Sequence, residues 1–171
     1  MRDRRYRPTV DTPVVRLGAW CDIVTEDEAR QRLLAEAADD GAADVHGHVG
    51  PGRFVPQPGV PVLSPGAIHF RVEEFAVLAD GRRVRLHAER GFGLSGGVDP
   101  WQYLTLEGLE AHVRATVLPD DAEDTGEDHP WEWLSDLLRV QGVEASTEEL
   151  RVLPYDVEFS DRLRVRVSAG A

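Results

Sequence analysis

The chemistry-bearing residues of this sequence are most concentrated between Pro119 and Asp136. Eight carboxylates and no arginine fall there, and Trp131 and Trp133 lie within the same stretch. Carboxylates steer a basic protein toward an interface, and a desolvated tryptophan supplies contact energy. We therefore expect this acidic segment, residues 119–136, to dock a protein partner with a basic surface through Asp120, Asp121, Glu123, Asp124, Glu127, Asp128 and Trp131.

Other interpretations of the acidic segment stay open. It is equally consistent with a solvated loop, with acids that favour the N-terminus of a following helix, or with tryptophans that are wholly buried. A calcium-binding loop does not fit, because Ala122 breaks the ligand pattern at its second position and Gly126 falls one residue late. Partner binding and a plain solvated loop therefore both remain as interpretations of the acidic segment.

Histidines form the best enzyme-like group. His46 and His48 stand two residues apart near Asp44, and His87 on a predicted strand could add a third ligand to one metal ion. This spacing is common, and no His-x-x-x-His or paired-cysteine pattern accompanies it. Loop histidines without a metal are the favoured interpretation, and a small metal-dependent hydrolase is the alternative function.

The stretch from Gly91 to Gly96 matches G-x-G-x-x-G, the pattern of dinucleotide-binding loops. Such a loop needs a helix that begins at the last glycine, whereas Gly97-Val-Asp-Pro100 follows here. Residues 93–97 also match the nucleophile elbow G-x-S-x-G, with Ser95 as nucleophile, but the chain is short for that fold and its sheet is predicted to be antiparallel. We expect a flexible connection at 91–100.

The net charge limits the partners. The chain has 171 residues and a formal net charge of −12, which falls to −4 without the eight carboxylates of the acidic segment. A surface of this kind repels nucleic-acid backbones and anionic lipid, which argues against nucleic acid and membrane as partners. Excess acid is also a common route to solubility.

Targeting and cysteine usage indicate a cytoplasmic protein. No apolar run approaches the roughly 20 residues that span a bilayer, and no apolar stretch follows the N-terminal arginines as it would in a secretory signal. Cys21 is the single cysteine, which excludes an internal disulfide. Because Asp22 disfavours a neighbouring thiolate, Cys21 is expected to be a small buried hydrophobe. No cofactor is predicted.

Capping signals predict helices over residues 25–41, 105–119, 129–142 and 146–154. Alternating apolar residues predict a short edge strand at 13–19. They also predict a hairpin of strands 68–78 and 84–88 around a type I′ turn at Asp80-Gly81. A bulge near Glu73 and Glu74 would reconcile the two halves of the first strand.

Outward positions of the hairpins carry charges. Arg83, Arg85 and His87 are expected to face away from the core. The chain is expected to end in a second hairpin of strands 155–159 and 163–167, with Asp156 and Glu158 paired across it with Arg162, Arg164 and Arg166.

These elements predict a single α+β domain over residues 13–171. A flexible arginine-rich arm, residues 1–12, precedes it, and a long Pro/Gly-rich loop occupies 41–66. The sheet is expected to be mainly antiparallel, with about four or five strands and three or four helices on one face. The leading function is a non-catalytic protein-binding module, which shares its physical class with immunity proteins and antitoxins. The oligomeric state stays open.

Overall fold

The computed structural model describes residues 12–39, 56–96, 99–118 and 131–170. The α+β class is confirmed. No helix within these ranges is long and apolar enough to cross a membrane. The elements in chain order are β1 (Val14–Val24), α1 (Glu26–Asp39), β2 (Ala67–Leu78), β3 (Arg83–Ser95), the 3-10 helix η2 (Pro100–Tyr103), α2 (Leu106–Val117), α3 (Trp131–Val140), α4 (Thr147–Arg151), β4 (Tyr155–Phe159) and α5 (Asp161–Gly170).

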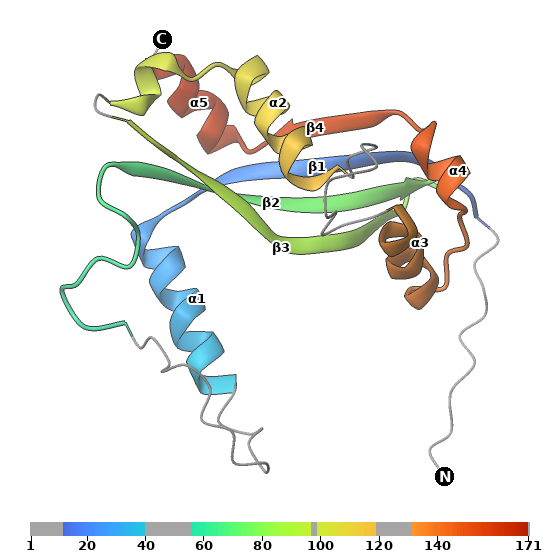
Figure 1. The fold of residues 1–171 in the computed structure, drawn as a ribbon, viewed down its shortest axis with the longest axis horizontal. Helices are drawn as coiled ribbons and strands as arrows, with labels where there is room; N and C mark the ends of the chain where they lie inside the picture. The colour runs from blue at the N-terminus through green and yellow to red at the C-terminus, as the bar shows by residue number, and fades with distance from the viewer. Residues whose placement is uncertain (1–11, 40–55, 97–98, 119–130, 171) are drawn as a thin grey trace, which may run out of the picture.

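The strands form one mixed sheet in the order β3-β2-β1-β4 (Figure 1). β1 is antiparallel to β2 and parallel to β4, and β2 is antiparallel to β3. The predicted edge strand at 13–19 is therefore an inner strand that runs on to Val24. The prediction failed because the partner on its second side, β4, comes from the far end of the chain.

The turn between β2 and β3 differs from the predicted type. Gly81 N donates to Leu78 O, Leu78 N donates to Arg82 O, and Gly81 has φ of 83°. No non-glycine residue in the described ranges has a positive φ, so Asp80 does not adopt the left-handed conformation that a type I′ turn requires. The hairpin is closed by a type I turn followed by a glycine bulge.

β3 is longer than predicted, because residues 91–95 continue it. Ile68 pairs with Leu94, and Phe70 pairs with Phe92. The flexible connection expected there is a strand, since Phe92 and Leu94 pack on the core between the glycines.

The register between β2 and β3 shifts on both sides of Glu74. From the Val72–Arg90 pair to the Glu74–His87 pair, β2 advances by two residues and β3 by three, and from there to the Phe75–Arg85 pair β2 advances by one and β3 by two. The two extra residues therefore lie on β3, and not on β2 as predicted. The shift places His87 on the same face as Glu74, which corrects its predicted outward orientation.

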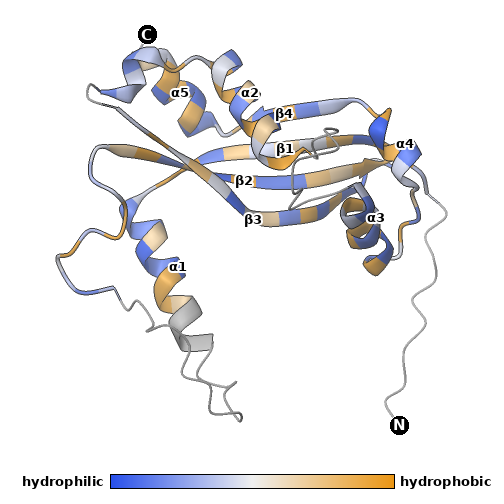
Figure 2. Ribbon diagram, viewed as in Figure 1, coloured by the Kyte–Doolittle hydropathy of each residue, from blue (hydrophilic) through white to orange (hydrophobic). Residues whose placement is uncertain are grey.

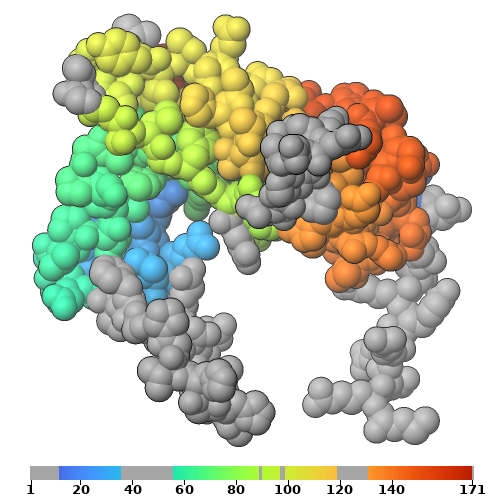
Figure 3. All heavy atoms as spheres, viewed as in Figure 1, coloured from blue at the N-terminus to red at the C-terminus, as the bar shows by residue number. Residues whose placement is uncertain are grey.

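One face of the sheet, which carries Leu17, Ala19 and Cys21, is the covered face. It bears two hydrophobic clusters. The first contains α2 and α5 residues such as Val113 and Leu163, and the second contains residues of α3 and α4. Figure 2 shows apolar and polar residues interspersed along these helices, and Figure 3 shows atoms of α2 and α3 over this side. α1 contributes to neither cluster, so the helices do not all pack as predicted.

The predicted second hairpin is wrong, because residues 161–170 form α5. Ser160 caps this helix: its Oγ accepts a bond of 3.2 Å from Leu163 N. Leu163 and Val167 are buried, whereas Val165 is 69% exposed. Leu163 and Val167 in this alternating pattern are four residues apart, so they also lie on one face of a helix.

Local capping signals gave the other helices correctly. Thr25 and Glu28 bond reciprocally at the start of α1. Ser146 and Glu149 form a capping box on α4, and Thr105 caps α2. Each of these caps joins residues three apart, so the sequence alone specifies it.

Candidate functional site

The described part of the acidic segment lies on α3. Residues 119–130, which include Asp120, Asp121, Glu123, Asp124, Glu127 and Asp128, lie outside the described ranges. On α3, Glu132 and Asp136 are exposed. Trp131 is only 8% exposed and packs with Leu134 and Leu138 in the core. Trp131 therefore anchors α3 on the sheet and does not present the exposed contact surface that its predicted role requires.

The histidines of the metal hypothesis are only partly described. His46 and His48 lie outside the described ranges. The ring of His87 is half-buried on the covered face, edge-on to Trp133 with centroids 5.0 Å apart. Across the residues that the structure describes, no group of three ligating side chains is arranged for a metal. A site at His46 and His48 stays a prediction that elemental analysis of the purified protein would check.

Ser95 and Cys21 do not occupy catalytic settings. Ser95 is the exposed last residue of β3, and its strand is antiparallel, so the strand-to-helix elbow of a nucleophilic serine is not formed. Cys21 is fully buried within β1. Burial, together with the charge of Asp22, raises the pKa of Cys21 to about 12, so the thiol stays protonated.

The other face of the sheet, which carries Gly18, Trp20 and Asp22, is the open face. Asp22 is 2% exposed there and joins distant elements. Arg162 of α5 donates to its Oδ1 through Nε at 2.7 Å, Arg71 of β2 donates to Oδ2 at 2.7 Å, and Ser160 also bonds it. Burial raises the pKa of Asp22, but the bonds from Arg162, Ser160 and Arg71 outweigh it and hold the pKa at about 2.

An ion pair crosses the middle of the open face. Arg83 of β3 donates to Glu158 of β4 at 2.8 Å. The Arg83 guanidinium carbon lies 3.3 Å from the ring centroid of Phe75, which is fully buried although it is on the open face. Gly18 leaves room for this ring, because a Cβ there would lie 2.6 Å from Phe75 Cζ. The Arg83 guanidinium therefore covers the Phe75 ring on the open face.

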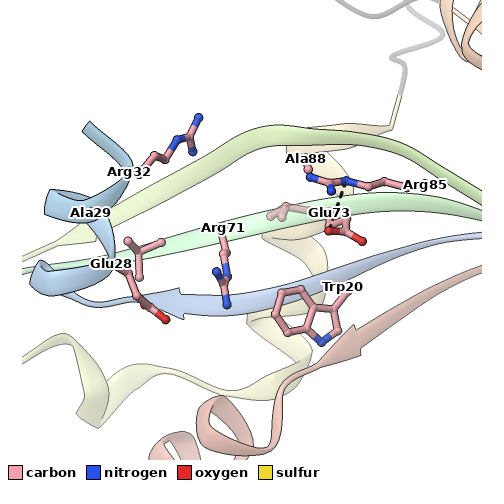
Figure 4. A pocket seen from close by; sticks show the side chains of 10 residues that line it. Trp20, Glu28, Ala29, Arg32, Arg71, Glu73, Arg85 and Ala88 are labelled. Carbon is pink, nitrogen blue, oxygen red and sulfur yellow. Dashed lines mark ion pairs between the residues drawn. The ribbon is translucent and has the colours of Figure 1, made fainter. Parts of the chain in front are cut away.

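Beside this ion pair lies a half-enclosed cavity of about 580 Å³. Figure 4 shows it between α1 and the open face, with Trp20 and Arg71 near each other on adjacent strands and Arg32 on α1. The Arg71 guanidinium carbon is 5.1 Å from the Trp20 ring centroid. The aromatic and charged residues that line the cavity are Trp20, Glu28, Arg32, Arg71, Glu73 and Arg85.

A second cavity of about 510 Å³ adjoins the first, because Val24, Ala29, Arg32 and Arg71 line both. His69 lines this second cavity, and its Nε2 is buried without a hydrogen-bond partner among the described residues. Buried polar atoms in proteins are nearly always bonded to protein or water. The two cavities share these four lining residues beside α1, and we call them together the arginine groove.

Little in the sequence indicates this groove. Trp20 and Asp22 occupy alternate positions, but the strand was predicted to end at Ala19. Arg162 is predicted to pair with Asp156 and Glu158 across a hairpin, which gives no indication of its bond to Asp22 across 140 positions. The alternation of Arg71 and Glu73 on the outward side of β2 was the available signal, and it gave no reason to expect a cavity.

The chain matches no protein-family model, and comparison with curated proteins and with solved structures finds no significant similarity.

Proposed function

We propose that the chain is a non-catalytic protein-binding module that docks a basic protein surface through its acidic segment, as immunity proteins and antitoxins neutralise basic partners. The observation that carries the proposal is the arrangement of α3. Its buried side holds Trp131, Leu134 and Leu138, and its exposed side holds Glu132 and Asp136. The acidic segment thus runs into a helix that is fixed on the core and presents Glu132 outward, while Asp136 is ion-paired with Arg139 on the same helix.

The ion pairs of the folded body also support this proposal. Arg16 is held by Asp156, Arg83 by Glu158 and Arg114 by Glu110. These arginines are committed to carboxylates close by. Residues 119–130 contribute six negative charges and no positive one. A basic partner would neutralise that excess and would be attracted from a distance at low salt.

The experiment first identifies a partner by capture with the full chain and mass spectrometry, and then titrates the purified partner. The test variant replaces Asp120, Asp121, Glu123 and Asp124 by Asn or Gln. We expect its affinity to fall by ~10-fold or more and the salt dependence of binding to weaken. The matched control removes four exposed acids elsewhere: Asp27, Glu107, Glu144 and Asp161.

The control variant has the same net charge as the test variant, so it separates a local docking surface from general acidity. Equal loss in both variants, or no loss in the test variant, would overturn the proposal. Glu132→Gln on α3 extends the test, because its side chain is exposed on a helix whose position the structure gives. We expect a smaller but additive loss from that change.

A further inference from the structure

Helix α1 stands apart from the hydrophobic core. Neither cluster of the covered face contains a residue of α1, and none of residues 26–35, for which the structure describes burial along this helix, is buried. Figure 1 shows α1 projecting from the end of the sheet, away from the helices of the covered face. Because most helices in proteins are stabilised by packing of an apolar face, the contacts that position α1 are of another kind.

Hydrogen bonds clamp α1 to residues 57–63, the segment that leads toward β2. Glu26 accepts from two successive backbone amides of this segment, at 2.7 and 3.1 Å. Arg30 donates to Gln57 O at 2.9 Å, and Arg30 and Glu26 also pair with each other at 3.1 Å. α1 and residues 57–63 are therefore joined as one unit, which we call the α1 flap.

An ion pair joins the α1 flap to α5. Arg162 donates to both carboxylate oxygens of Glu28, at 2.9 and 3.1 Å. The same guanidinium is fixed by the buried Asp22, whereas the side chains of Arg162 and Glu28 are 41% and 34% exposed. A pair of this exposure contributes little free energy and is screened by salt. Arg162 can therefore stay bound to Asp22 when Glu28 moves away.

The space between the α1 flap and the open face is not filled by side chains. The two cavities of the arginine groove, of about 580 and 510 Å³, lie there. Figure 4 shows Ala29 of α1 across the first cavity from Trp20, and Leu33 lines the second cavity with Gly93 of β3. Packed protein interiors contain few voids larger than a water molecule. The flap thus lies over the open face without packing tightly on it.

Both connections between the flap and the sheet are suited to rotation. Thr25 is the single residue between β1 and α1, and it is exposed. Gly66, which directly precedes β2, is also exposed and has φ of 75°, and its neighbours Ser64 and Pro65 are exposed as well. Hinges in proteins are a few loop or element-terminal residues that absorb changes in φ and ψ.

We propose that the α1 flap is a hinged lid over the arginine groove and that the Glu28–Arg162 pair is its latch. The latched state is the one described above, in which α1 half-encloses the cavity beside Trp20. In the open state the flap rotates about Thr25 and Gly66 and uncovers the open face. The clamp bonds survive this rotation, because both partners of each bond belong to the flap.

Double electron–electron resonance between nitroxide labels on the full chain tests this proposal. Leu34→Cys and Val60→Cys place labels on the flap, and Val140→Cys and Val165→Cys place them on helices of the covered face; all four native side chains are exposed. Cys21 is fully buried, so the reagent labels the introduced cysteines. Two flap-to-body pairs (34 with 165, 60 with 165), one body pair (140 with 165) and one clamp pair (34 with 60) are measured.

Glu28→Gln is the test variant, because glutamine preserves the capping bond at Thr25 and removes the charge that pairs with Arg162. We expect both flap-to-body distance distributions to shift together, while those of the body pair and the clamp pair stay unchanged. Raising the salt concentration should produce the same shift in the parent protein and no further shift in Glu28→Gln, because salt screens the ion pair.

Asp27→Asn is the matched control, since it removes one charge from an exposed side chain in the same turn of α1 and should shift none of the distributions. Circular dichroism checks that each variant keeps its helix content. The proposal is overturned if Glu28→Gln leaves the flap-to-body distributions unchanged, or if Asp27→Asn shifts them equally. It is also overturned if the clamp pair broadens with them, since α1 would then fray and not move as a unit.

The outcome is independent of the protein-docking proposal. The labels and variants of this experiment lie outside residues 119–136 and leave the net charge of that acidic segment as it is. Failure of the lid therefore leaves the docking of a basic partner by the acidic segment untouched.

Discussion

The Tyr155 hydroxyl donates a hydrogen bond of 3.2 Å to Oε1 of Glu74, a side chain that is 1% exposed on the covered face. Glu74 lies between Val72 of the first hydrophobic cluster and Ala76 of the second. Tyr155 packs against both clusters. Burial raises the pKa of Glu74 to about 8, although the bond from Tyr155 and the charge of Arg90 lower it. A protonatable carboxyl group therefore joins the two halves of the core.

Glu74 should make stability fall with rising pH. Its folded pKa of about 8 is above its ordinary value of 4.5, so its contribution is full below pH 4.5 and is lost as the pH rises through about 8. We expect Glu74→Gln to be more stable than the wild type at pH 9, by on the order of 3 kcal/mol, and similar to it at pH 4.5.

Urea unfolding of both proteins at several pH values measures this difference. The other carboxylates titrate in both proteins. The difference in the free energy of unfolding between the two proteins therefore reports on Glu74 alone. A difference that is constant across this pH range would contradict the assignment. Tyr155→Phe is the companion variant: it should be destabilised, because it leaves the buried carboxyl group without its bonded donor.

Asp22→Asn should destabilise the fold by about 3 kcal/mol, since it breaks a buried charge network that joins β1, β2 and α5. Asp156→Asn is the control, because its pair with Arg16 is exposed and should contribute less than about 1 kcal/mol. Chemical denaturation at pH 7 compares them. The pKa of Asp22, about 2, also means that its contribution is present above pH 3.8 and is lost as pH falls through about 2.

Gly18→Ala should destabilise the protein by about 1–3 kcal/mol or more, because the new methyl group overpacks the sheet. The Cβ would lie 2.6 Å from Phe75 Cζ and 2.7 Å from Asp156 O. Gly93→Ala is the matched strand variant, since the nearest atom to its Cβ is His69 Nδ1 at 3.5 Å. In thermal unfolding, we expect Gly18→Ala to lower Tm clearly and Gly93→Ala to lower it little. Equal shifts would show that loss of backbone freedom, and not overpacking, dominates.

Cys21 should resist thiol reagents in the native protein. It is fully buried, and its pKa is raised to about 12, so little thiolate is present at pH 8. Its modification by a disulfide reagent should therefore follow unfolding and accelerate in denaturant. Rapid labelling in buffer, at the rate of an exposed thiol, would contradict the buried position within β1.

The helices show how far local sequence reaches. α1, α2 and α4 begin at caps formed between residues three apart, and these were predictable. α5 was not, because Leu163, Val165 and Val167 fit a strand and a helix equally well. The helical conformation of α5 is supported instead by Ser160 and Arg162, which bond Asp22 more than one hundred positions earlier in the chain.

The sequence by itself determined the α+β class, the capped helices and the clustering of carboxylates in the acidic segment, since each depends on residues near one another in the chain. Only the tertiary structure decided that β1 is an inner strand, that Trp131 is buried and that Arg32, Arg71 and Arg85 line one cavity with Trp20. Those arginines come from three elements, and no local pattern encodes their approach. Sheet pairing over long sequence separations brings them together, because burial of the covered face fixes which residues remain on the open one.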